Sequence, residues 1–322
     1  MIKKTNYTDF SVTSKHHSGT SLLRQMKPYI PFYILLLIPL IQVIIFDFLP
    51  LYGISIAFKD FKMGRGIAGS DWVGLKHFQK VFTDPDFYRV VYNTIKISVA
   101  TLITTTPITI IFALLVNEIM GMRFKRVVQT ITYLPHFLSW VVVGGFVYQI
   151  LSPTSGIFNA FLVSLGVIDS PIYFMVEEQM FIPIYLITTL WKNTGYSIII
   201  YLASIAGIDT GLYESALIDG ANRFQRVLYI TLPSIAPTIS TLLILNMSTL
   251  ISVGFDPIFN LYNPSTYNVA DVISTYVYRR GLVEARYDST TAIGLAQNVI
   301  ALILILLSNF AARKANPDYK II

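Results

Sequence analysis

The polar side chains inside one long apolar segment, 181–206, are the residues of this sequence best suited to bind another molecule. Trp191, Lys192, Asn193 and Tyr196 fall together within it. An ionisable residue in such a segment is costly to bury and is usually functional. Aromatic rings can stack on a ligand, and an amide or ammonium group can bind its hydroxyl or carboxylate groups. The pattern fits a ligand-binding surface and a helix-packing contact equally well, and the sequence leaves both open.

Phe255 and Asp256 are a second candidate for the same binding surface, because they directly follow the apolar segment 234–254. Lys96 and Asp47 lie near the ends of other apolar segments. Residues in such places commonly anchor a helix at the interface between membrane and water. We therefore expect Lys96 and Asp47 to anchor helices and not to bind a ligand.

Catalytic signatures are absent from the sequence. No P-loop pattern, H-E-x-x-H or G-x-S-x-G string occurs, there is no cysteine, and the four histidines are scattered. Residues 64–69 have G-x-G-x-x-G spacing, but they follow no expected strand and open no expected helix, so they are predicted to be a flexible turn. We expect no catalytic residue, no metal site and no cofactor in this chain.

The composition indicates a membrane protein. Hydrophobic residues make up 54% of the chain and charged residues 13%, against about 25% charged in a soluble domain. Six stretches have the roughly 20 mostly apolar residues that cross a bilayer: 30–52, 91–117, 127–150, 181–206, 234–254 and 291–310. In hydrocarbon a backbone must satisfy its own hydrogen bonds. The sequence therefore predicts an all-α polytopic bundle of six transmembrane helices over 30–312, with tails at 1–29 and 313–322.

The distribution of Lys and Arg predicts the orientation of this bundle. The side that carries both termini and the loops 118–126 and 207–233 holds 13 of these residues, and the other side holds 9. The short loop 118–126 has three of them, whereas 151–180 has none. Lys and Arg concentrate on the cytoplasmic side of a membrane, so both termini are expected there. The same bias explains the pI of 9.3, which gives no support for nucleic-acid binding.

The loop 207–233 has the pattern of two short helices separated by a break. Asp209 or Thr210 can cap the first helix, with Glu214 near its positive end. Gly220 is able to adopt the positive φ that ends a helix, and Phe224 belongs to the apolar face of the second helix. Two partly apolar helices outside the lipid need a protein partner to cover them.

The same loop resembles the EAA loop of the permeases of ABC importers. The residues that match this motif, with its spacing kept, are Glu214, Ala216, Gly220, Ile230, Leu232 and Pro233. Ser215 stands where Ala is usual, and a small residue still permits close packing. Pro233 is also expected to mark the junction with the next span.

The resemblance implies that the loop is a coupling helix that docks into a groove on an ATPase subunit. The docking residues that it implies are Tyr213, Glu214, Ser215, Ala216, Asp219, Gly220, Ala221, Phe224, Ile230, Leu232 and Pro233. The alternative is an amphipathic loop that lies on the membrane surface.

The resemblance extends over nearly the whole chain. The outer segments 72–94 and 151–159 look like those of sugar-importer permeases. Segments 255–256, 271–279 and 291–294 resemble the branch of that group associated with complex oligosaccharides, including ones that contain uronic acids. The alternative for these outer segments is that they only close the bundle.

This family resemblance implies the fold of a type I ABC importer permease, working by alternating access in a bacterial cell membrane. The partners that it implies are a second homologous permease in a heterodimer, two ATP-binding subunits that carry ATP and magnesium, and an extracellular sugar-binding protein. A secondary transporter would instead show an internal repeat and acidic residues in mid-span. A membrane enzyme would show a catalytic constellation, and the sequence shows none of these features.

Overall fold

A computed structural model describes residues 29–315 and divides the chain into two compact units, Met1–Ser55 and Ile56–Ile322. The predicted tails therefore lie almost wholly outside the described residues. In the first unit, helix α2 (Ile30–Val43) continues into a π-helical turn, Ile44–Phe48. None of the residues of α2 is buried within the described part of the chain. A helix that is apolar all round has this exposure when lipid surrounds it.

The second unit begins with a small extramembrane segment and the longest helix of the chain. Two short strands, β1 (Lys59–Asp60) and β2 (Asp71–Trp72), pair antiparallel. Helix α3 (Lys76–Val81) follows, and then α4 (Pro85–Asn117). Asp84 caps α4, since its carboxylate accepts a hydrogen bond from the backbone of Asp86. The helix therefore starts six residues before the predicted span at 91.

The third predicted span, 127–150, is not one continuous helix. It consists of α5 (Met122–Tyr133), a 3-10 turn (Leu134–Phe137) and α6 (Trp140–Leu151), with a bend of 100° at the break. Pro135 lies in the turn, and Leu138 and Ser139 are extended. The apolar pattern predicts a span here but does not give its direction, and the structure bends it at the turn that contains Pro135. Helix α7 (Ile157–Ser164) follows.

The next two spans are joined by the loop that contains the EAA-like motif. Helix α8 (Glu178–Ala206) turns by 72° into α9 (Thr210–Ile218). After the break come α10 (Arg223–Arg226), a π-helical turn (Val227–Thr231), α11 (Leu232–Ser234) and α12 (Ala236–Met247). The chain stays helical through Pro233 and bends by 55° after Ser234. The junction predicted at Pro233 therefore falls at Ile235, just after this proline, which has no N–H for the helical hydrogen bonds and favours a bend there.

The last part of the second unit returns to the membrane through several short helices. These are α13 (Phe255–Phe259), α14 (Tyr267–Ala270) and α15 (Ile273–Val277), followed by a π-helical turn, Tyr278–Val283. The final helix, α16, runs over Tyr287–Ala315. Three helices of the described chain are long and apolar enough to cross a membrane alone, and three bent helix pairs raise the number to six. This agrees with the predicted number of spans.

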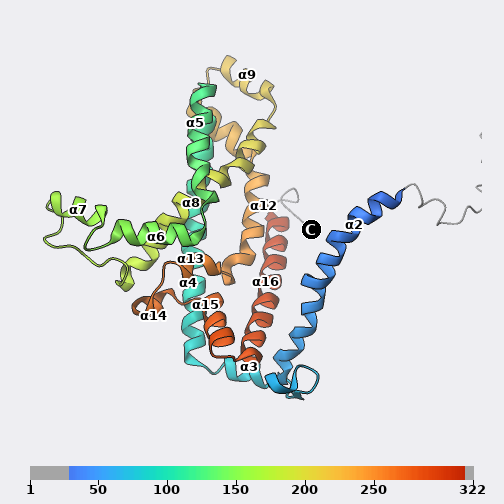
Figure 1. Cartoon of the computed structure of the whole chain (residues 1–322). Coiled ribbons are helices and arrows are strands. Elements are labelled where there is room, and N and C mark those ends of the chain that lie inside the picture. Colours follow the sequence, from blue (N-terminus) through green and yellow to red (C-terminus); the bar gives the residue numbers. More distant parts are fainter. Residues whose placement is uncertain (1–28, 316–322) are drawn as a thin grey trace, which may run out of the picture. The chain divides into compact units, whose positions relative to one another are not determined.

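Helices α4, α8, α12 and α16 form the body of the second unit (Figure 1). Helix α4 packs along α8, and α12 packs against α16. Two buried apolar clusters hold α4 and α8 together, one around Ile97 and Tyr185 and the other around Val116 and Ile198. In Figure 1, α9 and the start of α5 lie at one end of this body and α3 lies at the other.

Candidate functional site

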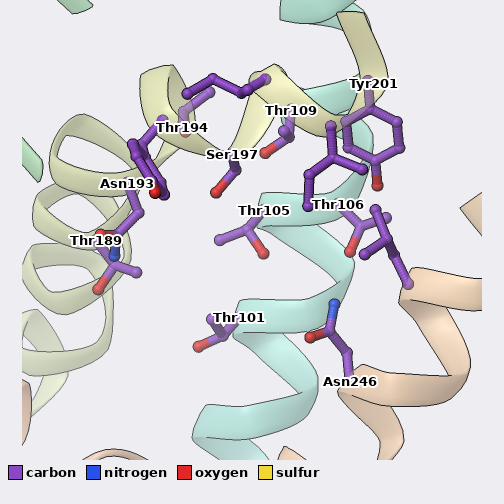
Figure 2. Close-up of a pocket in the computed structure, with 14 residues that line it drawn as sticks. Thr101, Thr105, Thr106, Thr109, Thr189, Asn193, Thr194, Ser197, Tyr201 and Asn246 are labelled. Carbon is purple, nitrogen blue, oxygen red and sulfur yellow. The ribbon is translucent and has the colours of Figure 1, made fainter. Parts of the chain in front are cut away.

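A cavity of about 470 Å³ lies between α4, α8 and α12. Figure 2 shows Thr101 and Thr105 of α4 facing Asn193 and Ser197 of α8 across it, with Asn246 of α12 beside them. None of the described residues that line it carries a charge. The cavity therefore offers hydroxyl and amide groups, which both donate and accept hydrogen bonds, inside a bundle whose outer surface is apolar.

A second hollow of about 390 Å³ continues this cavity along α4. Thr101, Thr105 and Asn246 line both spaces, so the two form one groove. We call it the threonine groove. Its polar wall includes Ser98, Thr101, Thr105, Thr109, Asn193 and Asn246.

The α4 side of this groove was not predicted from the sequence, although a signal for it exists. Ser98, Thr101, Thr105 and Thr109 recur every three or four residues, and this spacing places them on one face of a helix. A hydroxyl-bearing stripe within an apolar span marks the face that does not contact lipid. What the stripe could not indicate is that α8 and α12 supply the rest of the wall.

The predicted substrate-binding residues of α8 separate into three groups in the structure. Asn193 and Tyr196 line the threonine groove. Trp191 is 52% exposed on another side of the helix. Lys192 is 4% exposed and points toward the break in the third span. Lys192 thus faces the interior of the protein, as predicted for an ionisable residue in a span.

The second predicted pair, Phe255 and Asp256, lies at the start of α13 and outside the described lining of the threonine groove. Phe255 stacks on Phe259 with ring centroids 4.7 Å apart and also contacts Tyr278 at 5.0 Å. Asp256 is exposed. The structure therefore places this pair near one mouth of the groove, since the preceding Gly254 does line it.

Lys192 is held by backbone oxygen atoms. Its Nζ lies 2.6 Å from the carbonyl oxygen of His136, 2.7 Å from that of Leu138 and 3.3 Å from that of Pro135. It also lies 5.6 Å from the centroid of the Trp140 ring. An ammonium group has three N–H donors and no acceptor, so these three carbonyl groups use its full capacity.

The loop 207–233 forms the helix, break and helix that the sequence predicts. Asp209 caps α9 by accepting a hydrogen bond of 2.9 Å from the backbone of Gly211. The helix ends at Gly220, whose φ is +77°. The backbone N–H of Ala221 donates to the carbonyl of Ala216 and that of Gly220 to Leu217, which is the hydrogen-bond pattern of a Schellman motif. The prediction that Gly220 adopts a positive φ and ends the first helix is confirmed.

The second helix of the loop is fixed by local hydrogen bonds and by one contact to the first helix. Asn222 and Gln225 form a capping box at the start of α10, and the Tyr213 hydroxyl lies 2.9 Å from that of Thr231. Glu214 does not lie in the first turn of α9, so its predicted interaction with the positive end of that helix is wrong.

The predicted docking residues lie on α9, the break after it, α10, the π-helical turn and α11. A hollow of about 290 Å³ between these elements is lined by Ala216, Asp219, Gly220, Ala221 and Ile230 among others. Large apolar side chains lie open beside it: Ile218 is 88% exposed and Phe224 is 74% exposed. This surface is apolar and outside the spans, which is typical of a surface that another protein covers.

A buried ion pair fixes the segment 271–279, which precedes α16. Asp271 is fully buried; its carboxylate accepts hydrogen bonds from Arg279 and, at 2.7 Å, from the Thr275 hydroxyl. Its backbone carbonyl accepts one from Asn93 of α4. Burial raises the pKa of the Asp271 carboxyl, and the Thr275 hydrogen bond and the Arg279 charge oppose this shift.

A bundle of apolar helices with a polar groove inside and an uncovered helical loop at one end defines a membrane transport subunit. The chain belongs to the family of binding-protein-dependent transport system inner membrane components, whose profile matches residues 98–320. It is 39% identical over 89% of its length to the polygalacturonan/rhamnogalacturonan transport system permease protein YteP of Bacillus subtilis, of which it covers 88%. It is 37% identical to protein LplB of the same organism over 93% of its length, covering 94% of that protein.

Solved structures of ABC transporters match this chain as well. The chain superposes with a TM-score of 0.83 and 40% identity on a chain of a bacterial ABC transporter involved in the import of the acidic polysaccharide alginate. The match covers 92% of this chain and 99% of that one. A bacterial alginate ABC transporter in complex with an alginate pentasaccharide-bound periplasmic protein matches with a TM-score of 0.82. The chain is thus a multi-pass permease subunit of a binding-protein-dependent ABC importer for sugars, and it is a transporter subunit, not an enzyme.

Proposed function

We propose that this permease moves oligosaccharides that contain uronic acids along the threonine groove. The observation that carries the proposal is the polar lining of a cavity of about 470 Å³ inside an otherwise apolar bundle. Polar residues at membrane depth commonly mark a transport path. The substrate class is supported by the relatives, one named for polygalacturonan and rhamnogalacturonan and another for alginate.

The lining of the groove suits the ring hydroxyl groups of a sugar. The Thr101 hydroxyl donates to the carbonyl of Ile97 in its own helix and can still accept a hydrogen bond. The Thr105 hydroxyl can donate and accept, the Asn193 amide can donate, and the Tyr196 ring offers a stacking face. The described lining is uncharged, so recognition within the groove concerns hydroxyl groups and not carboxylates. A neutral oligosaccharide is therefore the second candidate substrate, favoured by this absence of charge.

We also propose that the loop 207–233 docks an ATPase subunit in the cytoplasm. The support is the open apolar surface around Ile218 and Phe224, together with the Lys and Arg bias that predicts this side to be cytoplasmic. A second homologous permease in a heterodimer would complete the path, and an extracellular binding protein would deliver the sugar. ATP and magnesium are bound by the ATPase subunits, which drive alternating access by favouring one state of the permease pair over the other.

Replacement of Thr105 by Val tests the groove in the assembled transporter. Thr105 lines both parts of the groove, and valine removes its hydroxyl while keeping its shape. Uptake of labelled galacturonic-acid oligomers should show a KM raised about five- to tenfold, as expected for the loss of one hydrogen bond of about 1–1.5 kcal/mol.

Thr104→Val is the matched control. The Thr104 hydroxyl donates to the carbonyl of Ala100 in its own helix, and it is absent from the described lining of the groove. Its KM should remain that of the wild type. Equal KM values for the two variants would contradict the assignment of the groove as the transport path. The same uptake measurements with neutral oligomers decide between uronic-acid and neutral oligosaccharides as the substrate class.

A further inference from the structure

The break in the third span leaves backbone carbonyl groups that need donors. The 3-10 turn ends at Phe137, and Leu138 and Ser139 are extended before α6 begins. The regular helical pattern of N–H donors is therefore interrupted at this point. In a membrane such groups cannot rely on bulk water, so protein donors must replace the missing ones. Lys192 of α8 supplies three N–H groups to the carbonyls of Pro135, His136 and Leu138.

Other contacts fix the same break to the same turn of α8. The His136 ring stacks on Tyr196 with centroids 4.0 Å apart and planes within 2° of parallel. Its Nδ1 lies 3.1 Å from Oδ1 of Asn193. Gly195 lies so close to the backbone of Thr132 in α5 that a side chain would collide with it. The break and the end of α5 are thus clamped to α8 by four residues within 192–196.

This clamp adjoins the wall of the threonine groove. Asn193 and Tyr196, which contact His136, also line the groove. Lys192 itself lies outside the described lining, is 4% exposed and has all three N–H groups directed at carbonyl oxygens. A substrate carboxylate would have to displace those carbonyls to reach it.

We propose that Lys192 is a positioning residue of the transport path: it holds the break at 134–139 against α8 and thereby sets the orientation of Asn193 and Tyr196 in the groove wall. It does not contact the sugar. This inference rests on the proposed function of the threonine groove.

The test combines transport with a distance measurement in the assembled transporter. The chain has no native cysteine, so cysteines placed at Val141 of α6 and Ile187 of α8, both exposed, are the only thiols of this chain and take its spin labels before assembly with the partner subunits. In Lys192→Met the label-to-label distance distribution should shift or broaden, because α6 loses its anchor. Uptake should fall by a similar factor, about tenfold or more, for acidic and neutral oligosaccharides alike, as expected when a wall is misplaced.

Lys192→Arg keeps donors and charge at the same place, so it should retain the wild-type distance distribution and recover part of the uptake. Unchanged distances in Lys192→Met would overturn the clamp. A loss confined to acidic oligosaccharides would also overturn the proposal, because it would make Lys192 a carboxylate ligand. Altered distances with unchanged uptake of both sugars would overturn the link to transport, and would argue against the groove itself as the path.

Discussion

Replacement of Gly195 by Ala places a methyl group between α5 and α8. An ideal Cβ at this residue would lie 2.0 Å from the carbonyl oxygen of Thr132 and 2.4 Å from its carbonyl carbon. Non-bonded atoms attract one another only beyond about 3.5 Å, so the two backbones would have to separate locally by about 1.5 Å. The obstructing atoms are main chain, and no side-chain rotation relieves the contact. Overpacking of this kind destabilises a protein by about 1–3 kcal/mol.

Thermal unfolding of the purified transporter measures this effect. One kcal/mol corresponds to about 2–4 °C for a domain of 150–250 residues, so the Tm of Gly195→Ala should fall by about 2–12 °C. Gly145→Ala is the matched control, because Gly145 lies inside α6 and an added Cβ would meet nothing within 4 Å. Alanine favours a helix over glycine by about 1 kcal/mol, so this control should be as stable as the wild type or more stable. A Gly195→Ala variant with a Tm at or above that of the control would refute the close approach of α5 to α8.

Two further predictions concern the coupling loop and the outer ion pair. Gly220→Val should insert into the membrane but lose its bound ATPase in co-purification, because valine resists a φ of +77°, whereas Gly220→Asn should keep the ATPase, since Asn tolerates this conformation; equal retention by both would contradict the docking assignment. Arg279→Leu should cost about 3 kcal/mol, because it leaves the buried Asp271 carboxylate without its cation. Burial already raises the pKa of Asp271, so the stability contributed by this group is fully present below its unfolded-state pKa and is lost as the pH rises through the folded-state value. The variant should therefore lose more Tm at pH 8 than at pH 5, and a loss independent of pH would contradict this account.

The number of spans and the coupling loop could be predicted because their causes are local. About 20 apolar residues make a span wherever they occur, and Gly220 ends α9 through its own backbone conformation. The break in the third span depends instead on hydrogen-bond donors that belong to another helix, α8. Lys192 lies more than fifty residues from the carbonyls it binds, and nothing in the spacing of the sequence pairs them.

The groove, too, could be predicted only in part from the sequence. The hydroxyl stripe of α4 follows from helical periodicity, whereas the neighbouring walls depend on how α8 and α12 pack. The sequence indicated that Lys192 would face inward, and its burial confirms this. Its contacts with backbone oxygens, in place of a ligand, follow only from the fold. A buried cation in a span can therefore bind either a ligand or backbone carbonyl groups. The position of the neighbouring carbonyl groups decides between these two roles.

The regular spacing of the groove hydroxyls bears on how a sugar chain would move. Thr101, Thr105 and Thr109 recur every four residues, which places them about 6 Å apart along the helix axis. A polymer advancing along α4 would exchange each hydroxyl partner for a chemically identical one at every such step. The free-energy profile along the proposed path is then nearly level, without a deep minimum to arrest the cargo. Such a surface discriminates poorly between sugars of different length or linkage, so selection among them falls to the step that delivers the sugar.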